Sequence, residues 1–287
     1  MQKVFVVMGP TASGKSDFAV DLALKNNGEI ISADSRQIYK NLDIGTGKIT
    51  EKEMLGVKHH MLDICDLNDE FSVTEYKKLA ELVIEDILSR GKTPIICGGT
   101  GQYIDIIIFD TDIPKVPPNK VLREKLEKKA TPELFEMLIS KDKRRAKNID
   151  KDNRVRLIRA LEIIETLGFV PKQDTPKLKY KTEIYLMSPT RTLLRERITT
   201  RLEKRLKVGM IDEVKNIMKK GYTIYDMKKF GLEYVAISKF LEGKITEEET
   251  KQEIITKSCQ YAKRQETWNK KYTKKYPDII TKINVNN

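Results

Sequence analysis

The sequence predicts an α/β protein in which a parallel sheet is flanked by helices and interrupted by a helical insertion domain. Short apolar runs alternate with helical stretches over residues 1–114, which is the pattern of a parallel sheet. Residues 115–182 are basic and helical in pattern, and Glu183–Met187 then resembles a strand that returns to the first sheet. We therefore expect a core made of residues 1–114 and 183–287, with residues 115–182 as the insertion.

The first element is a strand that leads into a phosphate-binding loop. The apolar run Val4–Met8 precedes Gly9–Ser16, which satisfies the G-x-x-x-x-G-K-[S/T] pattern, and a helical stretch follows. Backbone N–H groups and the helix start would cradle a di- or polyphosphate. Lys15 would neutralise phosphate oxygens, and the Ser16 hydroxyl would hold Mg²⁺. This context disfavours a chance glycine-rich turn and predicts a P-loop NTPase-like sheet, but it does not distinguish ATP or GTP from another phosphate ligand.

The next elements continue the alternation of strands and helices. Glu29–Ser32 predicts a strand, and Ala33–Lys40 leaves its carboxyl end. Met61–Ile64 predicts a further strand. Ser72 and Glu75 have capping-box spacing at the start of a helix that ends near Gly91. The run from Lys92 to Cys97 predicts a buried strand, which a glycine-rich turn at Gly98–Gly101 follows.

The remainder is mostly helical. Pro114, Pro117 and Pro118 mark the boundary. Asn153 and Gly168 have the character of an N-cap and a C-terminal stop for a helix over Arg154–Leu167, on which Arg156 and Arg159 share one face. After Pro189 a helix carries two stripes, and Lys251–Lys275 is a long basic helix. The apolar stripe comprises Leu194, Ile198, Leu202 and Leu206, and the basic row comprises Arg197, Arg201 and Arg205. We interpret the basic row as a mixed, salt-bridged face, with ligand recognition as the alternative.

Charge and composition narrow the class of protein. Residues 1–114 carry a net charge of −6, whereas residues 115–182 carry +9 of the total of +12. This asymmetry favours a polyanionic partner such as nucleic acid, although a Lys-rich soluble surface explains charge alone equally well. No run is apolar enough for a membrane span, and Met1 leaves no room for a targeting peptide before the first strand. Three scattered cysteines and two histidines argue against disulfides and a zinc site. We expect a cytoplasmic protein, with no membrane partner.

Three loops should meet at the carboxyl edge of the sheet, where open α/β sheets bind ligands. They are Gly9–Ser16, Asp34–Lys40 and Gly98–Gly101. Asp34 could bind Mg²⁺ or accept a proton, but a turn carboxylate is the simpler explanation of this residue alone. Thr100 could contact an anion or merely form a tight turn.

Together, these blocks resemble the tRNA dimethylallyltransferase (tRNA isopentenyltransferase) family. The resemblance runs in family order from the first strand to about Trp268. It is carried by Gly9–Ser16, Asp34–Lys40, Asp43–Lys48, His60–Asp63, Gly98–Tyr103, Arg156–Glu162 and Ala262–Trp268. It implies transfer of a dimethylallyl group from dimethylallyl diphosphate to the exocyclic N6 amine of the adenosine 3′-adjacent to the anticodon in tRNA, with release of diphosphate.

The resemblance also implies roles for particular residues. Asp34 would hydrogen-bond the amine and remove its proton, while Lys15 and Thr100 complete the predicted catalytic set. Diphosphate would bind to Gly9, Pro10, Thr11, Ala12, Ser13, Gly14, Lys15 and Ser16, with Mg²⁺ at Ser16. The anticodon stem-loop of tRNA would meet Asp34, Ser35, Arg36, Gln37, Thr100, Arg123, Arg156, Arg159, Lys263 and Arg264.

Several details differ from the family or stay weak. The stretch Lys141–Asn153 is rich in Lys and Arg and lacks the usual Pro and Ala pattern, and Lys228 and Lys229 match a position near the diphosphate only loosely. Trp268 is expected to pack and position a helix, and His59 has either a structural or a site role. The chain lacks a zinc-finger extension, which is typical of the bacterial form, and a monomer is expected.

Three other functions remain open at this point. An adenylate isopentenyltransferase would share the diphosphate loop and the base but act on a free nucleotide. A small-molecule ATP kinase would use Asp34 as base but leave the charge distribution unexplained. A non-enzymatic RNA-binding protein with a relic loop is disfavoured by intact Lys15, Ser16 and Asp34.

Overall fold

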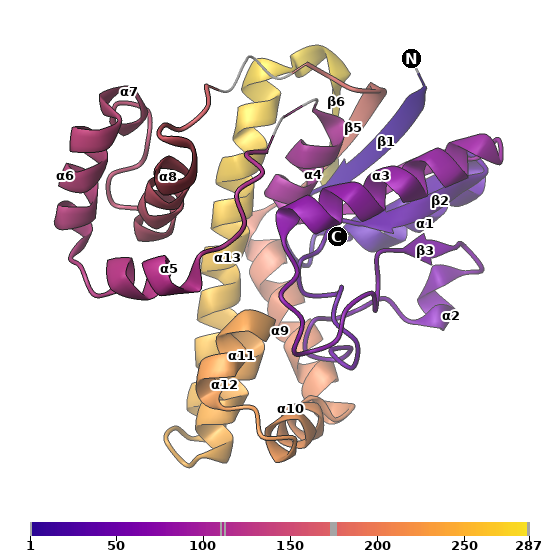
Figure 1. Cartoon of the computed structure of the whole chain (residues 1–287). Helices are drawn as coiled ribbons and strands as arrows, with labels where there is room; N and C mark the ends of the chain where they lie inside the picture. The colour runs from indigo at the N-terminus through magenta and orange to yellow at the C-terminus, as the bar shows by residue number, and fades with distance from the viewer. Residues whose placement is uncertain (1, 110, 112, 173–176, 286–287) are drawn as a thin grey trace. The chain divides into compact units, whose positions relative to one another are not determined.

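The computed structural model describes residues 2–109, 111, 113–172 and 177–285 (Figure 1). Two compact units divide the chain: Met1–Asp110 with Leu178–Asn287 form the first, and Thr111–Lys177 form the second. The second unit begins four residues and ends five residues before the predicted bounds 115–182. The reason is that Phe109 and Leu178 form an antiparallel bridge within the first unit, just before the returning strand.

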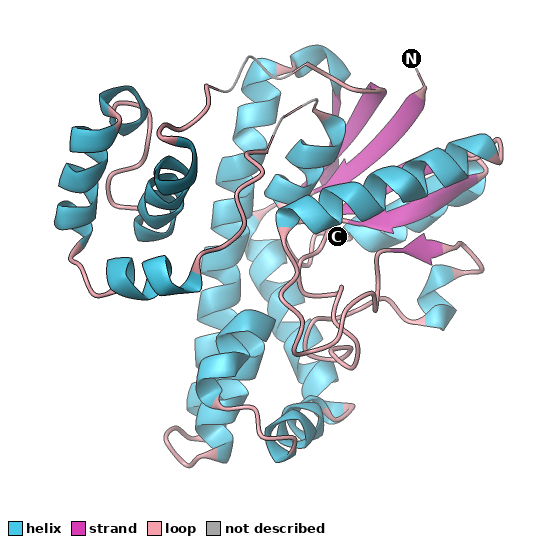
Figure 2. Cartoon of the chain, viewed as in Figure 1, coloured by secondary structure: helices cyan, strands magenta, loops and turns pink. Residues whose placement is uncertain are grey.

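A six-stranded, wholly parallel sheet lies at the centre of the first unit, in the order β3-β2-β4-β1-β5-β6 (Figure 2). Its strands are β1 (Lys3–Met8), β2 (Gly28–Ser32), β3 (His59–His60), β4 (Thr93–Gly98), β5 (Lys181–Pro189) and β6 (Ile280–Val285). The α/β fold and the return of β5 beside β1 are confirmed. Strand β6, which pairs in parallel with β5, was not predicted, because Lys282 and Asn284 interrupt its apolar pattern.

The sheet is covered on both faces, as buried parallel strands require. Helix α1 (Lys15–Lys25) packs on one face through Ala19, Val20 and Ala23. Helices α3 (Val73–Ser89) and α4 (Gly101–Ile108) pack on the other face (Figure 1). Helix α3 begins with the predicted capping box of Ser72 and Glu75. The fully buried Tyr76 on α3 also donates a hydrogen bond to the carbonyl of Ser32, 2.9 Å away, and thereby ties α3 to β2.

The predicted strand at Met61–Ile64 is wrong. Strand β3 covers only His59–His60, and the chain turns directly after it. Met61 and Asp63 have φ angles of 64° and 53°, in the left-handed region that a strand cannot contain. Residues 61–63 therefore form a turn, in which Leu62 lies between two residues with a left-handed backbone conformation.

A second, helical layer of the first unit holds the segment that follows β2. It comprises α9 (Arg191–Lys207), α10 (Met210–Lys219), α11 (Ile224–Phe230), α12 (Leu232–Leu241) and α13 (Glu247–Lys275). The short helix α2 (Glu51–Met54) precedes β3, and the 3₁₀ turn η1 (Pro277–Ile279) precedes β6. The core of this layer joins Ile38, Tyr39 and Leu42 to Met210, Phe230, Tyr234 and Ile254. The predicted apolar stripe of α9 is confirmed, since Leu194, Ile198 and Leu202 are buried. The chain beyond the strand end of β2 is thus fixed by distant helices.

The described residues of the second unit form four helices. They are α5 (Lys120–Glu127), α6 (Thr131–Lys141), α7 (Lys143–Ala146) and α8 (Arg154–Leu167). Their core includes Leu126, Leu134, Leu138, Leu157 and Leu161. The predicted bounds of α8 are confirmed: Asn153 caps its start by accepting from the N–H of Arg156, and Gly168 closes it at a φ of 81°.

None of the helices in the described ranges combines the length and the apolar character that a membrane crossing requires. Cys65, Cys97 and Cys259 are free thiols.

Candidate active site

The phosphate loop joins β1 to α1 at the carboxyl edge of the sheet. Gly9 is required for close packing, because a Cβ there would lie 2.8 Å from both the Met187 Cβ and the Ser13 hydroxyl oxygen. Ala12 and Gly14 adopt left-handed φ angles of 59° and 82°, which bend the loop between them. The hydroxyl of Ser13 is buried without a hydrogen-bond partner in the described part of the chain, so its side chain faces the protein.

Lys15 and Ser16 follow the loop at the start of α1. The Lys15 ammonium donates to the carbonyl of Pro10 over 3.3 Å. Burial lowers the pKa of Lys15, whereas the neighbouring Cys97 and Asp34 raise it. The hydroxyl of Ser16 is exposed at the same edge. The two side chains are therefore placed where an anion at the loop would meet a cation and a hydroxyl.

Asp34 lies opposite the phosphate loop, just beyond the carboxyl end of β2. One of its carboxylate oxygens accepts from the N–H of Arg36 at 2.9 Å, so it forms a turn while the side chain stays half-buried. Thr100 supports the same turn, because its hydroxyl oxygen accepts from the N–H of Ser35 at 3.2 Å. Gly98 allows the two loops to touch: a Cβ there would lie 2.2 Å from the carbonyl oxygen of Ala33. Asp34 therefore stabilises a local turn and also faces the phosphate loop.

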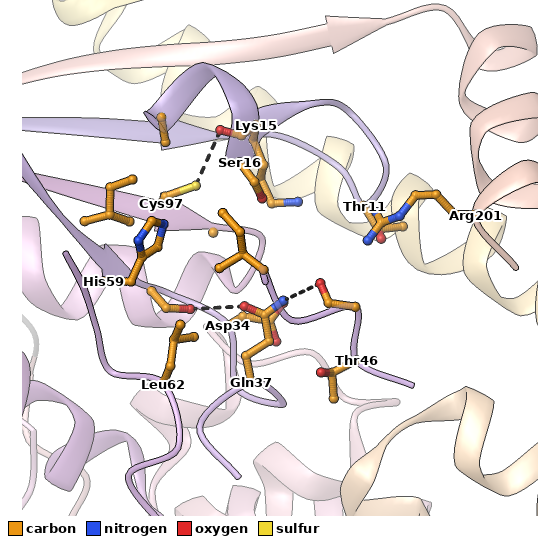
Figure 3. Close-up of a pocket in the computed structure, with 16 residues that line it drawn as sticks. Thr11, Lys15, Ser16, Asp34, Gln37, Thr46, His59, Leu62, Cys97 and Arg201 are labelled. Carbon is orange, nitrogen blue, oxygen red and sulfur yellow. Dashed lines mark hydrogen bonds between the residues drawn. The ribbon is translucent and has the colours of Figure 1, made fainter. Parts of the chain in front are cut away.

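A pocket opens between these loops (Figure 3). Lys15 and Ser16 of the phosphate loop form one polar wall, and Asp34 and Gln37 form the wall that faces it (Figure 3). Thr11, Thr46 and Arg201 add further polar lining, and the side chains of Ala19, Ile30, Ile49 and Leu62 form the apolar wall. The Gln37 amide donates to the carbonyl of Gly47 over 3.3 Å, which joins the segment after β2 to the next loop. The structure thus brings Asp34 and the phosphate loop together as predicted. Thr100 supports the pocket through Ser35 and is not among the residues that line it.

Two other titratable groups in the pocket remain neutral. Burial lowers the pKa of His59, whose Nδ1 lies 2.9 Å from the carbonyl oxygen of Val57. Burial raises the pKa of the Cys97 thiol to about 12, and this thiol lies 3.6 Å from the carbonyl oxygen of Lys15. Among the described residues that line the pocket, Asp34 is therefore the one carboxylate, and it lies opposite the phosphate loop.

Arg201 follows the alternative interpretation of the basic row on α9, which was ligand recognition, and not the favoured one of a salt-bridged face. Arg197 and Arg201 line a hollow beside Gly14, Lys15 and Ser16. Within the described ranges Arg201 has no carboxylate within ion-pair distance, and burial followed by the adjacent Arg205 lowers its pKa to about 10. Arg205 alone fits the original interpretation, since it lies 4.0 Å from Glu233. The four-residue spacing of the arginines placed them on one face of α9, but it did not show that this face points towards the phosphate loop.

Gln265 is a site residue that was not predicted. From α13 its amide oxygen accepts from the N–H of Thr11 at 2.8 Å, and its amide nitrogen donates to the carbonyl of Gly99 at 2.9 Å. This buried side chain ties the phosphate loop to the loop after β4 and occupies the Thr11 N–H, which is consequently not free for a ligand. Three residues along the same helix, Trp268 packs against Gly101, where a Cβ would lie 2.3 Å from the indole. The predicted packing role of Trp268 is confirmed.

Other predicted residues lie outside this pocket. Lys229 donates to the carbonyl of Leu67 at 2.9 Å, and the Lys228 ammonium lies 4.9 Å from the centre of the Tyr225 ring. The loose match of these two lysines to a diphosphate position is therefore not supported. Lys263 and Arg264 are exposed on α13, with the Arg264 guanidinium 5.6 Å from the centre of the Tyr261 ring.

Two arginines of the second unit have an internal partner. Arg123 pairs with the fully buried Glu162 through contacts of 2.8 and 2.9 Å, and Arg159 pairs with the same carboxylate while donating to the Val116 carbonyl at 2.8 Å. Burial alone would raise the pKa of Glu162, but hydrogen bonds from Arg123, the Asn119 N–H and Arg159 lower it to about 2. These contacts give Arg123 and Arg159 a structural task within their own unit.

The exposed Arg156 lies on a different part of this unit. Burial, then the charges of Arg156 and Arg144, lower the pKa of Arg145. The Nε atom of Arg145 is buried without a hydrogen-bond partner in the part of the chain that is described. Arg144, Arg145, Asn148 and Lys172 line a basic hollow there. The Lys- and Arg-rich stretch in the sequence was the signal for this cluster.

The side chains at the phosphate loop fit one kind of metal site only. No group of three or more His, Cys, Asp or Glu residues in the described ranges could hold a metal ion by itself. Mg²⁺, however, commonly keeps several waters and takes one or two protein ligands together with substrate phosphates. The exposed hydroxyl of Ser16 beside the loop is suited to that mode and to no all-protein cage.

Comparison with known proteins identifies the family. The family model described as IPP transferase matches residues 37–272. A tRNA dimethylallyltransferase of Caldanaerobacter subterraneus subsp. tengcongensis is 42% identical over 281 residues, which span 94% of this chain and 89% of the relative. The tRNA dimethylallyltransferase 2 of Treponema denticola is 41% identical over 268 residues, 92% of this chain and 90% of the relative.

Solved structures give the same answer. The full-length tRNA isopentenylpyrophosphate transferase of Bacillus halodurans has a TM-score of 0.73 and 33% identity, with 99% of this chain and 90% of that chain covered. A eukaryotic dimethylallyltransferase described as acting on tRNA has a TM-score of 0.84 and 26% identity, with 99% and 74% covered. With a family match over most of its length and relatives above 40% identity, this chain belongs to the IPP transferase family, the family of the tRNA dimethylallyltransferases.

Proposed function

We propose that this protein transfers a dimethylallyl group from dimethylallyl diphosphate to the N6 amine of the adenosine 3′-adjacent to the anticodon of tRNA. The observation that carries the proposal is the single pocket in which Asp34 faces the phosphate loop. A base stands on one wall and a cradle for a leaving diphosphate on the other, as prenyl transfer to an amine requires. Its family membership supplies the substrate class.

The donor is expected to lie along the pocket with its two ends on different walls. Its diphosphate would take backbone N–H groups of the Gly9–Ser16 loop other than that of Thr11, together with the Lys15 ammonium and the Arg201 guanidinium. Its five-carbon tail would contact Ile30, Ile49 and Leu62, which form the apolar wall. Mg²⁺ would be held by Ser16 with diphosphate oxygens, and when bound it supplies positive charge that stabilises the leaving group.

The chemistry exchanges one bond for another. The bond between the allylic carbon and the diphosphate oxygen breaks, and a bond from that carbon to N6 forms. Diphosphate leaves with the electron pair of the broken bond, and N6 loses a proton to the Asp34 carboxylate. An exocyclic adenine amine is a weak nucleophile, so orientation and a base are what the protein adds. Lys15 and Arg201 stabilise the charge that develops on the leaving group.

The adenine must leave its stack to reach Asp34, so the protein must also hold the surrounding RNA. We propose that Ser35, Arg36 and Gln37 contact the RNA beside Asp34, where Thr100 holds their turn. Lys263 and Arg264 are exposed for phosphate contacts, and Arg156 with the basic hollow of Arg144 and Arg145 provides them in the insertion. We place the activity in the cytoplasm, with the protein as a monomer.

A product assay tests this function directly. The protein is incubated with dimethylallyl diphosphate, Mg²⁺ and unmodified tRNA, and the nucleosides are analysed by mass after digestion. Prenylated adenosine from tRNA is the expected product. Product from free AMP instead of tRNA would identify an adenylate isopentenyltransferase, and phosphoryl transfer from ATP without prenylation would identify a kinase.

Arg201 should control donor binding more than folding. Arg201→Gln is expected to raise the KM for dimethylallyl diphosphate about 10- to 100-fold, because one charge-assisted hydrogen bond contributes about 1.5–3 kcal/mol. Its thermal midpoint should stay constant or rise, since the wild-type guanidinium is half-buried beside Arg205 without a carboxylate partner in the described ranges. Arg195→Gln, at an exposed position of the same helix, is the control. A lower thermal midpoint with an unchanged KM would make Arg201 purely structural.

Substitutions of Arg156 and Arg159 in the insertion should have different effects. Arg156→Gln is expected to weaken tRNA binding and to reduce the salt dependence of the binding constant by about one counterion, because Arg156 is exposed. Arg159→Gln should instead lower the stability of the second unit, since it removes a partner of the buried Glu162. Filter binding at several salt concentrations and thermal unfolding measure the two effects. Equal salt slopes for wild type and Arg156→Gln would reject the phosphate contact.

A further inference from the structure

Glu213 lies outside the pocket yet holds one of its walls. It stands in the first turn of α10, and its carboxylate accepts hydrogen bonds from three consecutive backbone N–H groups. One oxygen accepts from Asp43 and Ile44 at 2.9 and 2.8 Å, and the other accepts from Gly45 at 2.9 Å. The two segments are 168 to 170 residues apart in the sequence. One carboxylate, distant in the sequence, thus accepts from the first three backbone N–H groups of the Asp43–Lys48 loop.

The Glu213 carboxylate, which acts as a clamp on the N–H groups of residues 43–45, is itself held in place by Tyr234. The hydroxyl of this fully buried tyrosine donates to Glu213 at 2.7 Å. Burial, then the charge of Glu213, raises the pKa of Tyr234, so the hydroxyl stays protonated and remains a donor. Gly45 admits this close contact, because a Cβ there would lie 2.5 Å from the tyrosine ring. The arrangement leaves little freedom for the loop to shift.

The far end of the same loop reaches the pocket. Thr46, Gly47 and Ile49 line it. The carbonyl of Gly47 accepts from the Gln37 amide, and a Cβ on Gly47 would overlap the Arg205 guanidinium and lie 2.6 Å from that of Arg201. The loop therefore touches the group proposed to bind diphosphate and orients a side chain of the Asp34 wall.

We infer that Glu213 is a positioning residue for prenyl transfer, which acts through the Asp43–Lys48 loop on Gln37 and Arg201. This inference rests on the proposed function. A displacement of about 1 Å in groups that orient reactants costs about 100-fold in rate. Loss of the carboxylate should therefore lower turnover without direct contact between Glu213 and substrate.

Glu213→Gln is the decisive variant. It keeps the side-chain shape, but its amide NH₂ group faces at least one backbone N–H donor that the carboxylate accepted. We expect kcat for tRNA prenylation to fall about 10- to 100-fold, with the dissociation constant for tRNA little changed. Asp212→Asn, an exposed neutralisation one residue earlier on the same helix, should leave kcat unchanged.

Tyr234→Phe separates positioning from stability. It removes the hydroxyl donor to Glu213 but leaves the three N–H contacts, so it should lower the unfolding midpoint while kcat per folded molecule changes little. Fluorescence of Trp268, the single tryptophan, gives the folded fraction of each variant in the assay. If kcat per folded molecule of Glu213→Gln equals that of Tyr234→Phe, or if Asp212→Asn loses as much, the positioning role is overturned.

Hydrogen exchange tests the clamp independently of activity. In Glu213→Gln the amides of residues 43–45 should lose protection relative to wild type and Asp212→Asn, and unaltered protection would overturn the inference. A wild-type protein that makes no prenylated tRNA would overturn the proposed function and the positioning role with it. Active wild type with an unimpaired Glu213→Gln would overturn only the latter.

Discussion

Replacement of Asp34 by Asn is expected to reduce the rate of prenyl transfer to tRNA about 100- to 10,000-fold, the contribution typical of a positioned base. The variant should keep the local turn, because an Asn oxygen can still accept from the N–H of Arg36. It removes the anionic group opposite the phosphate loop, while the neighbouring His59 is held neutral by burial and Cys97 by a pKa of about 12. No other described side chain of that wall is suited to take the amine proton.

Single-turnover measurements with saturating donor and tRNA isolate this effect. Binding of tRNA and of dimethylallyl diphosphate to Asp34→Asn should stay close to wild type. Asp21→Asn, an exposed carboxylate of α1, is the matched control and should retain the wild-type rate. A loss of tRNA affinity as large as the loss of rate would make Asp34 a docking residue, and a wild-type rate would exclude it as the base.

The parts of this site that could be predicted from the sequence are local in the chain. The phosphate loop lies within eight residues, and its strand and helix neighbours are visible as periodic patterns. Asp34 follows a strand end, and the parallel sheet brings strand ends to one edge. The phosphate-loop motif, together with the rule that ligands bind at the carboxyl edge of a parallel sheet, therefore predicted that the phosphate loop and Asp34 face each other.

The missed residues act across long separations. Gln265 meets Thr11 across 254 positions, and Glu213 meets Asp43 across 170. A single Gln or Glu on a basic or amphipathic helix carries no local signal for such a partner, because only tertiary packing brings the segments together. Arg201 shows the same limit: periodicity placed it on the correct helix face, but the partner of that face depends on how α9 packs.

The turn at residues 61–63 was predicted wrongly for a different reason. Met61 occupies a left-handed conformation that its residue type disfavours, although Asp63 tolerates one, so the apolar pattern predicted a strand there. An ion pair from outside the turn holds it: the buried ammonium of Lys48 lies 2.5 Å from Asp63, which is 15 positions away, and 2.6 Å from Asp43. Tertiary ion pairs thus overrode the local preference at a turn that presents Leu62 to the pocket.

The stability of the first unit should depend strongly on Glu29, whose side chain is only 2% exposed at the start of β2. Arg90 binds its carboxylate with two contacts of 2.6 and 2.7 Å, and Lys92 and His60 each lie 2.8 Å from it. Glu29→Gln is expected to lower the free energy of unfolding by about 2–3 kcal/mol, because it removes charge-assisted hydrogen bonds from a buried acceptor. The partly exposed Arg90 and Lys92 can turn to water, which keeps the cost below that of a fully buried pair.

The pH dependence of this difference identifies its cause. Hydrogen bonds from Arg90, against the opposing effect of burial, hold the pKa of Glu29 well below its usual range. Its contribution is therefore complete above the unfolded pKa of about 4.3 and decreases as the pH falls towards the folded pKa. Urea unfolding of wild type and Glu29→Gln, followed by Trp268 fluorescence, should show a constant gap from pH 7 to 5 and a smaller gap at pH 3.5. Glu183→Gln, which breaks an exposed pair with Lys3, should cost less than about 1 kcal/mol. A gap for Glu29→Gln no larger than this control, or one that widens in acid, would show that the Glu29 cluster does not stabilise the sheet.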